Sequence, residues 1–371
     1  MGVARAAEAM GSPEREVNPL QTQMEARLIS GPISASEVMA LALYDPEHGY
    51  YRRAEGPWGF EGKDYYTALD LGPLLGQTLA LRLEAAWTQL GGPPVFTVLE
   101  PGAGRGWLGR DLLTAARGDF AKALRYVHRD DNPAARRMAE EALAPWLGTD
   151  RARFVAETDF LEPFTGAILS NELFDALPAQ PWKWDGARWV REVLTEGGPE
   201  WHAANDPAPG AWFETVMKAK GESLEPSDGS IWCESLPAVV HTLSASLKSG
   251  LFLAIDYGDS AERLLAKGSD LRRFTGHTVD GKWWEQVGEC DLTADVDFTR
   301  LVSLLEAEGM VETTHQELSK WIRTHAPLME WEDQWQELPA AERIKRMENL
   351  LQLTLPGMMG ARFRVLEAWK R

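Results

Sequence analysis

Two groups of residues in this sequence have types and spacing suited to chemistry. The first is Glu100-x-Gly102-x-Gly104-x-Gly106, which follows an apolar, β-branched run beginning at Val95. Glycines at alternate positions let the main chain turn tightly, so that a ligand can approach the backbone and the start of the next helix. The second is Asn171-Glu172-Leu173-Phe174-Asp175, which follows the apolar run 166–170. Carboxylates at such a strand end are placed to orient a substrate and to accept a proton.

The spacing of the glycine loop restricts its ligand. A dinucleotide fingerprint needs a glycine three residues after its second glycine, and Trp107 occupies that position. A nucleoside site also needs an acidic residue roughly 20 to 30 residues downstream, after the next strand. Asp130 follows the expected strand 124–129 and fits this role. The alternative for the glycine loop is a tight turn that binds no ligand. The alternative for Asp130 is that it only caps the helix beginning near Pro133, for which Asp131 and Asn132 are the other cap candidates.

The glycine loop resembles the first motif of the Rossmann-like S-adenosylmethionine (SAM) methyltransferases, in which it contacts the methionine part of the cofactor. Over about residues 28–371 the chain is similar to the MidA-like methyltransferases, a family that includes a mitochondrial complex I assembly factor reported as a protein arginine methyltransferase. The further matching segments occur in family order: 31–34, 44–51, 171–178, 255–258, 291–298 and 357–366.

The resemblance implies SAM as the cofactor and a protein acceptor, a respiratory complex subunit. We expect cofactor contacts from Glu100, Gly102, Ala103, Gly104, Gly106, Asp130, Asp159, Phe160 and Asn171. Asp159 and Phe160 follow the strand expected at 154–156 and would meet the adenine, although they could equally form a turn. The chain departs from the family at 63–70, at Asp295, where His is common, and at Asp130, where Glu is common.

A guanidinium acceptor has a pKa too high for prior removal of its proton, so carboxylates must orient it as the new bond forms. We expect Glu172 to do this, with Asp175 or Asp256 assisting and Asn171 fixing the loop or the substrate. The alternative is that Glu172 and Asp175 only brace the loop and that Asp256 is a turn carboxylate bonded to backbone amides. The expected substrate-side residues are His48, Tyr50, Tyr51, Asp64, Tyr66, Thr67 and His277. For the tyrosines around His48, ordinary packing over the sheet is the alternative.

Composition limits the classes of partner. The net charge of −18 argues against a nucleic-acid backbone, because phosphate binding needs clustered Lys and Arg. The two cysteines and the scattered histidines have no metal-ligand spacing, so we expect no metal. No apolar run reaches the length of a membrane span. Glu8, Glu14 and Glu16 argue against a transit peptide, so we expect a cytoplasmic protein. The sequence does not decide whether the protein is a monomer or a homodimer.

The expected fold class is α/β: a Rossmann-like methyltransferase sheet with helices on both faces, an N-terminal helical segment and an inserted substrate-side cap. We divide the chain into a loose tail (1–22), an N-terminal helical segment (23–92), a SAM-binding core (93–258, with a hairpin and loop insertion at 180–230), an inserted cap over the active-site mouth (259–296), and C-terminal helices with a final strand (297–371). Within the last part, 314–356 is expected to be helical.

Three functions fit this reading. The first is methylation of arginine on a protein partner. The second is an assembly or interaction module that keeps the fold, binds SAM and does not catalyse. The third is methylation of a small molecule, which would give turnover with metabolites and none with protein.

Overall fold

The fold is seen in a computed structural model that describes residues 18–52, 68–275 and 278–371. Its largest sheet has the strand order β15-β16-β10-β5-β2-β3-β4. The five strands from β10 to β4 run parallel, whereas β16 is antiparallel to both of its neighbours. The strands are β2 (Phe96–Pro101), β3 (Leu124–Arg129), β4 (Ala152–Val155), β5 (Phe164–Asn171), β10 (Leu247–Asp259), β15 (Val311–Glu317) and β16 (Phe363–Lys370). The short β14 (Val296–Asp297) pairs with the end of β10.

Helices bury both faces of this sheet. Apolar side chains of β2, β10 and β16 pack on one side against α3 (Leu74–Gln89), α4 (Trp107–Ala115), α5 (Gly118–Ala123), α11 (Leu318–His325) and α13 (Ala340–Thr354). Alternate residues of β10 and β16 pack on the other side against α8 (Leu236–Ser246) and α10 (Phe298–Ala307). The remaining helices of this half are α6 (Pro133–Leu143), α12 (Leu328–Trp335) and α14 (Met359–Arg362). The expected Rossmann-like α/β fold is therefore confirmed.

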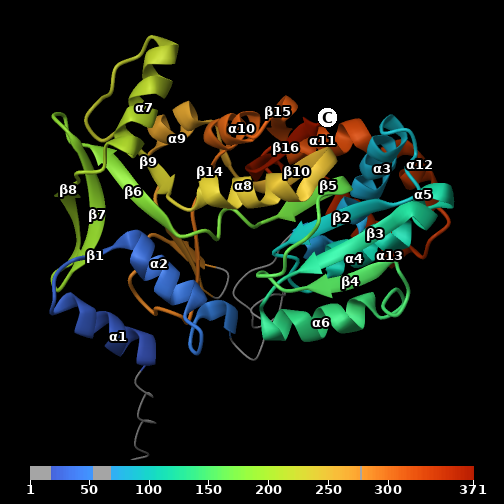
Figure 1. Ribbon diagram of the computed structural model, residues 1–371, viewed down its shortest axis with the longest axis horizontal. Helices are drawn as coiled ribbons and strands as arrows, with labels where there is room; N and C mark the ends of the chain where they lie inside the picture. Colours follow the sequence, from blue (N-terminus) through green and yellow to red (C-terminus); the bar gives the residue numbers. More distant parts are fainter. Residues whose placement is uncertain (1–17, 53–67, 276–277) are drawn as a thin grey trace, which may run out of the picture.

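A second, antiparallel sheet lies beside the first, at the left of Figure 1. Its order is β1-β7-β6-β9, with β8 paired to β7. The strands are β1 (Ile33–Ser34), β6 (Ala179–Trp184), β7 (Trp189–Thr195), β8 (Gly198–Ala203) and β9 (Gly229–Cys233). The hairpin expected within 180–230 is β6–β7, which turns at Asp185-Gly186, and it is followed by β8 and α7 (Pro207–Lys220). Strands β8 and β9 were missed, since Pro and Gly in this region suggested loops.

The N-terminal segment joins this second sheet through β1. Ile33 of β1 pairs with Leu194 of β7, and α2 (Ala35–Tyr44) follows directly, with a capping box formed by Ser34 and Glu37. α1 (Pro19–Leu28) precedes it, with Asn18 as N-cap and Leu20 and Met24 buried. The boundary of the loose tail at residue 22 was therefore wrong, because the helix already begins at Pro19. Two one-turn 3₁₀ helices, η1 (Tyr50–Arg52) and η2 (Ala68–Leu71), complete this segment.

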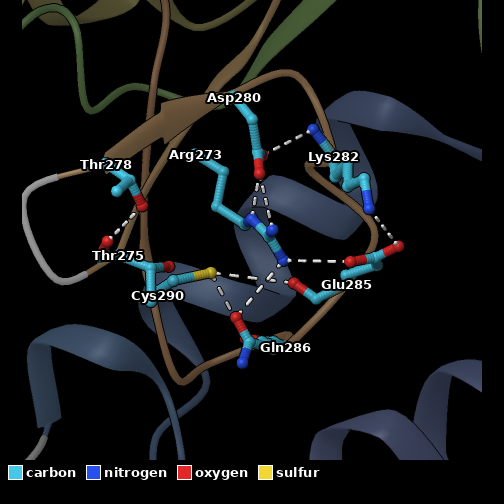
Figure 2. Close-up of polar contacts among 8 residues, drawn as sticks. All are labelled: Arg273, Thr275, Thr278, Asp280, Lys282, Glu285, Gln286 and Cys290. Atoms are coloured by element: carbon cyan, nitrogen blue, oxygen red, sulfur yellow. Dashed lines mark hydrogen bonds and ion pairs between the residues drawn. The ribbon is translucent and has the colours of Figure 1, made fainter.

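The segment 259–296 is a folded unit of α9 (Ala261–Lys267) and a small sheet of β11 (Arg272–Thr275), β12 (Thr278–Asp280) and β13 (Asp291–Thr293). Arg273 is 8% exposed and holds it together (Figure 2), since its guanidinium donates to both oxygens of Asp280 at 2.8 and 3.0 Å and lies 3.4 Å from Glu285. Its apolar residues, including Trp283 and Leu292, pack onto α1 and α2.

The C-terminal part differs from expectation at one point. The helical region expected from residue 314 begins as strand β15, which pairs with β16 and completes the sheet edge, and helix starts only at Leu318. In the described parts of the chain, no helix is both long and apolar enough to cross a membrane, and no group of three His, Cys, Asp or Glu side chains is arranged to hold a metal ion.

Candidate active site

The site lies where the order of the central sheet reverses. Strand β2 has β3 on one side and β5 on the other, and ligands of open α/β sheets bind at the carboxyl ends of such strands. A cavity of about 320 Å³ opens there, within the usual range of about 300–1,000 Å³ for ligand pockets. Its described lining includes Glu100, Gly102, Ala103 and Gly104 from the glycine loop, Asp130, Asp131, Asn132 and Glu157 from the next turns, and Asn171, Glu172, Leu173 and Ala176.

The glycine loop has the backbone that its sequence predicts. Gly102, Gly104 and Gly106 have φ of +65°, +50° and +67°, which side-chain-bearing residues rarely adopt. A Cβ on Gly102 would lie 2.9 Å from Leu173, whereas a Cβ on Gly104 would meet no atom within 4 Å. The backbone at Gly104 thus faces open space in the cavity, the arrangement that a ligand needs to approach the main chain.

Asp130 is tied to the glycine loop. Its carboxylate accepts hydrogen bonds from the N–H of Gly104 at 2.8 Å and of Asn132 at 2.7 Å. The N-cap of α6 is Asn132, whose side chain accepts from the N–H groups of Ala134 and Ala135. The cap alternative for Asp130 is therefore wrong, and its carboxylate lines the cavity.

Glu172 and Asn171 bring unusual features to the opposite wall. Glu172 has a φ of +52°, and its N–H donates to the carbonyl of Ile255 at 2.9 Å. The Asn171 amide donates to the Glu172 carboxylate at 3.1 Å, and the Asn171 Oδ1 is buried with no hydrogen-bond donor among the described residues. A strained backbone and an unpaired buried acceptor at a cavity are typical of ligand sites.

Two cavity carboxyls have strongly raised pKa values. Burial, and then the nearby Asp175, raise the pKa of Glu172 to about 8. Burial also raises the pKa of Glu100 to about 8, although the hydroxyl of Tyr126 donates to it at 2.6 Å and opposes the shift. A positive charge beside either carboxyl would lower its pKa and favour its charged form.

Asp175 and Asp256 lie behind the loop and do not line the cavity. Asp256 is fully buried, and its carboxylate accepts from the N–H groups of Phe174 at 2.8 Å and Leu173 at 3.2 Å. Asp256 is therefore a turn carboxylate bonded to backbone amides, which was the alternative to a catalytic role. Its hydrogen bonds fix the loop that presents Glu172. Asp175 is 4% exposed, and burial raises its pKa to about 6.

The residues expected on the substrate side divide into three groups. Tyr51 lines the cavity and donates to the Asp291 carboxylate at 3.1 Å. Tyr50 is fully buried against α2, so it packs in the interior, as the alternative for these tyrosines stated. The His48 side chain is 47% exposed and does not line the cavity. Asp64, Tyr66, Thr67 and His277 lie outside the described residues.

The role of the inserted segment as a cap over the mouth stays a prediction. None of its described residues lines the cavity, because its apolar side chains pack onto α1 and α2. Its contribution is the support that Asp291 gives to Tyr51. Tyr44 also lines the cavity, where its hydroxyl donates to the carbonyl of Ala176 at 2.8 Å.

Sequence reasoning missed several wall residues. Asp159 accepts from the N–H of Ala156 and Phe160 is 81% exposed, so they form a turn, and Glu157 lines the cavity in their place. Its position just after β4 matches that of Asp130 after β3 and could have identified it. Arg52 and Arg105 also line the cavity, and nothing in their spacing marks them.

A parallel sheet with a glycine loop at its reversal point and an acidic residue after the next strand defines a Rossmann-like protein with a nucleoside-type cofactor site. Residues 78–315 match the family model described as "Putative S-adenosyl-L-methionine-dependent methyltransferase". The chain belongs to this family of SAM-dependent methyltransferases, which confirms the family and the cofactor expected from the motifs.

Similar proteins agree with this family. A Drosophila melanogaster protein named protein arginine methyltransferase NDUFAF7 homolog, mitochondrial, is 27% identical over 97% of this chain and 86% of its own length. A Xenopus laevis protein of the corresponding name is 27% identical over 72% of this chain and 65% of its own length. A crystal structure from Burkholderia thailandensis, bound to S-adenosyl-homocysteine, has the same fold, with a TM-score of 0.82, 23% identity and coverage of 98% of this chain and 95% of that one.

Proposed function

We propose that this protein transfers a methyl group from SAM to an arginine side chain of a protein acceptor. The observation that carries the proposal is the wall formed by Glu172 and Asn171. It presents a carboxyl with a raised pKa and an unpaired amide oxygen to the cavity that the glycine loop borders. The names of the Drosophila and Xenopus relatives point to the same acceptor.

The donor half of the cavity fits SAM. Gly102 to Gly104 would admit its methionine part against the main chain, and Asp130 would accept hydrogen bonds from ribose hydroxyls. Arg52 lines the same cavity and offers a cation for the methionine carboxylate. SAM supplies a methyl group on a sulfonium, which is already a good leaving group, so the protein mainly has to align the reactants and exclude water.

The acceptor half suits a guanidinium. A guanidinium beside Glu172 lowers the pKa of that carboxyl, which becomes charged and holds the cation by charge-assisted hydrogen bonds. The Asn171 Oδ1 accepts another N–H of the same group. The guanidinium keeps its proton until its nitrogen is methylated, and Glu172 accepts that proton as the bond forms. Asp256 and Asp175 act as positioning residues behind the loop.

Labelled SAM, the purified chain and a cell extract would test this proposal. Label in a protein band, located by mass spectrometry on an arginine, is the expected result. Label on another residue type would contradict the arginine assignment, and label only in metabolites would favour a small-molecule methyltransferase. SAM binding with no transfer to any fraction would favour an assembly module.

The compartment also stays a proposal. A cytoplasmic location is the expectation from the sequence, whereas the relatives are named as mitochondrial proteins. Fractionation of the source cells with an antibody to this chain would decide between them.

A further inference from the structure

A second cavity, of about 470 Å³, lies at the carboxyl end of β10. Tyr257, Gly258 and Asp259 line it from β10, together with residues of α9, β11 and the start of β16. The cavity is close to the loop of Glu172, because the N–H of Glu172 donates to Ile255, two residues before Tyr257. The N–H of Ala294 also donates to the carbonyl of Asp175, which ties the inserted segment to this loop. The two cavities share no lining residue among those described, so they are separate sites at one edge of the sheet.

The second cavity is basic in a protein whose net charge is −18. Two carboxylates line it: Asp295 lies 2.7 Å from Arg272 and 3.6 Å from Lys267, and Asp259 lies 2.7 Å from Arg364 and 3.4 Å from Arg263. A fifth cation, Arg362, lines the cavity with no ion-pair partner in the part of the chain that the structure describes. The lining therefore has an excess of positive charge, which attracts anions locally.

Two guanidinium groups of this cavity have buried nitrogens without a hydrogen-bond partner. In the described chain, the Nε and Nη2 of Arg272 and the Nε of Arg364 are buried without an acceptor. The planar fork of arginine matches a carboxylate through two parallel hydrogen bonds. Apolar side chains, among them Leu264 and Phe274, form part of the wall and suit the methylene groups of an acidic side chain.

From these contacts we infer that the second cavity binds carboxylate side chains of an acidic segment of the protein acceptor, next to the arginine that Glu172 holds. The inference rests on the proposed function, since it assumes a protein acceptor. The cavity is larger than one small anion needs, and its lining residue Tyr257 follows the Ile255 carbonyl to which Glu172 donates by two residues. A peptide with its arginine at Glu172 would therefore extend toward the second cavity. The net charge of −18 disfavours binding of such a segment to the rest of the protein.

Fluorescence anisotropy with a labelled peptide of six glutamates tests the inference without requiring turnover. The wild-type chain is expected to bind the peptide, and Lys267→Glu/Arg362→Glu is expected to weaken binding at least tenfold, because two cations become anions. A matched control, Lys122→Glu/Arg188→Glu, makes the same charge change at exposed positions outside the cavity. It should bind within about twofold of wild type. SAM affinity, measured in the same samples, checks that each variant is folded.

Three results would overturn the inference: no binding of the glutamate peptide to the wild-type chain, equal weakening in both double variants, or binding of inorganic pyrophosphate without binding of the peptide. The last result would define a small-anion site. Failure of methyl transfer with peptide binding intact would contradict the proposed function alone, so the two failures can be told apart.

Discussion

Arg105 of the glycine loop and Asp70 of the N-terminal segment form a buried ion pair. The guanidinium donates to both carboxylate oxygens, at 2.9 and 3.1 Å, and the side chains are 5% and 3% exposed. Arg105 also stacks over the ring of Trp107 at 3.8 Å. The loop that borders the cofactor cavity is therefore joined to the segment that supplies the tyrosines of the opposite side.

Removing one partner of this pair is expected to destabilise the protein strongly. Asp70→Ala removes the carboxylate that both guanidinium donors of the buried Arg105 contact, and breaking a buried ion pair typically costs about 3–5 kcal/mol of unfolding free energy. Urea denaturation measures this loss of unfolding free energy. Asp70→Leu/Arg105→Met removes both charges and should cost much less. If the single variant lost less than the double variant, the pair would not be what holds the two segments together.

Gly104→Val is expected to abolish SAM binding, measured by calorimetry. Its side chain would extend into the open space that a ligand needs, at a φ of +50°. Gly148→Val is the matched control, because Gly148 has a φ of +78°, meets no atom within 4 Å and does not line the described cavity. Unchanged SAM affinity in Gly104→Val would refute the cofactor assignment of the loop.

Asp130→Ala and Asn132→Ala separate cofactor binding from helix capping. If Asp130 holds ribose hydroxyls, its removal should weaken SAM binding by about 1–3 kcal/mol, the usual effect of leaving polar partners unpaired. Asn132→Ala removes the N-cap of α6 and should cost about 1 kcal/mol of stability. Calorimetry and thermal unfolding measure the two effects. Equal SAM affinity in Asp130→Ala and wild type would assign Asp130 a purely local role at the glycine loop.

Most of the fold could be predicted because local patterns and tertiary structure agree. The alternation of glycines from Gly102, the capping box at Ser34 and the turn at Asp185-Gly186 each specify a backbone geometry that depends on neighbours in sequence. Strand β15 could not be predicted in this way. Its residues Val311 and Glu312 are exposed, and only the pairing with β16 makes a strand of them.

The site was predictable where a motif carries its own geometry, and less so elsewhere. The positions of Asp130 and Glu172 follow from strand ends, so the sequence placed them at the same edge of the sheet. Whether Asp256 faces the ligand or the loop depends on side-chain direction, and the amides of Leu173 and Phe174 draw it to the loop. The pairing of Asp70 with Arg105 joins distant segments, and no local pattern marks such a pair.

The difference in unfolding free energy between Glu172→Gln and the wild type should change with pH in a defined direction. The folded-state pKa of Glu172 is about 8, above the ordinary value of 4.5, so the folded protein holds a proton that the unfolded chain releases. The wild-type free energy of unfolding therefore falls from this source as the pH rises between about 4.5 and 8. Gln does not titrate, so the stability of the variant relative to the wild type should increase across this pH range. Urea denaturation at pH 5, 7 and 9 measures the difference; Glu348→Gln, at an exposed position, is the control. A difference that stays constant with pH would contradict the raised pKa of Glu172.

The central claim is that Glu172 takes part in transfer and is not needed to bind SAM. The most direct test measures SAM affinity and the transfer of labelled methyl groups to a protein acceptor for wild type and Glu172→Gln in the same preparations. The account predicts SAM affinity within about twofold of wild type and transfer reduced by about 10²–10⁴, the usual range for loss of a proton-accepting group. Undiminished transfer by Glu172→Gln would contradict it and would leave Glu172 as a brace of the loop after β5.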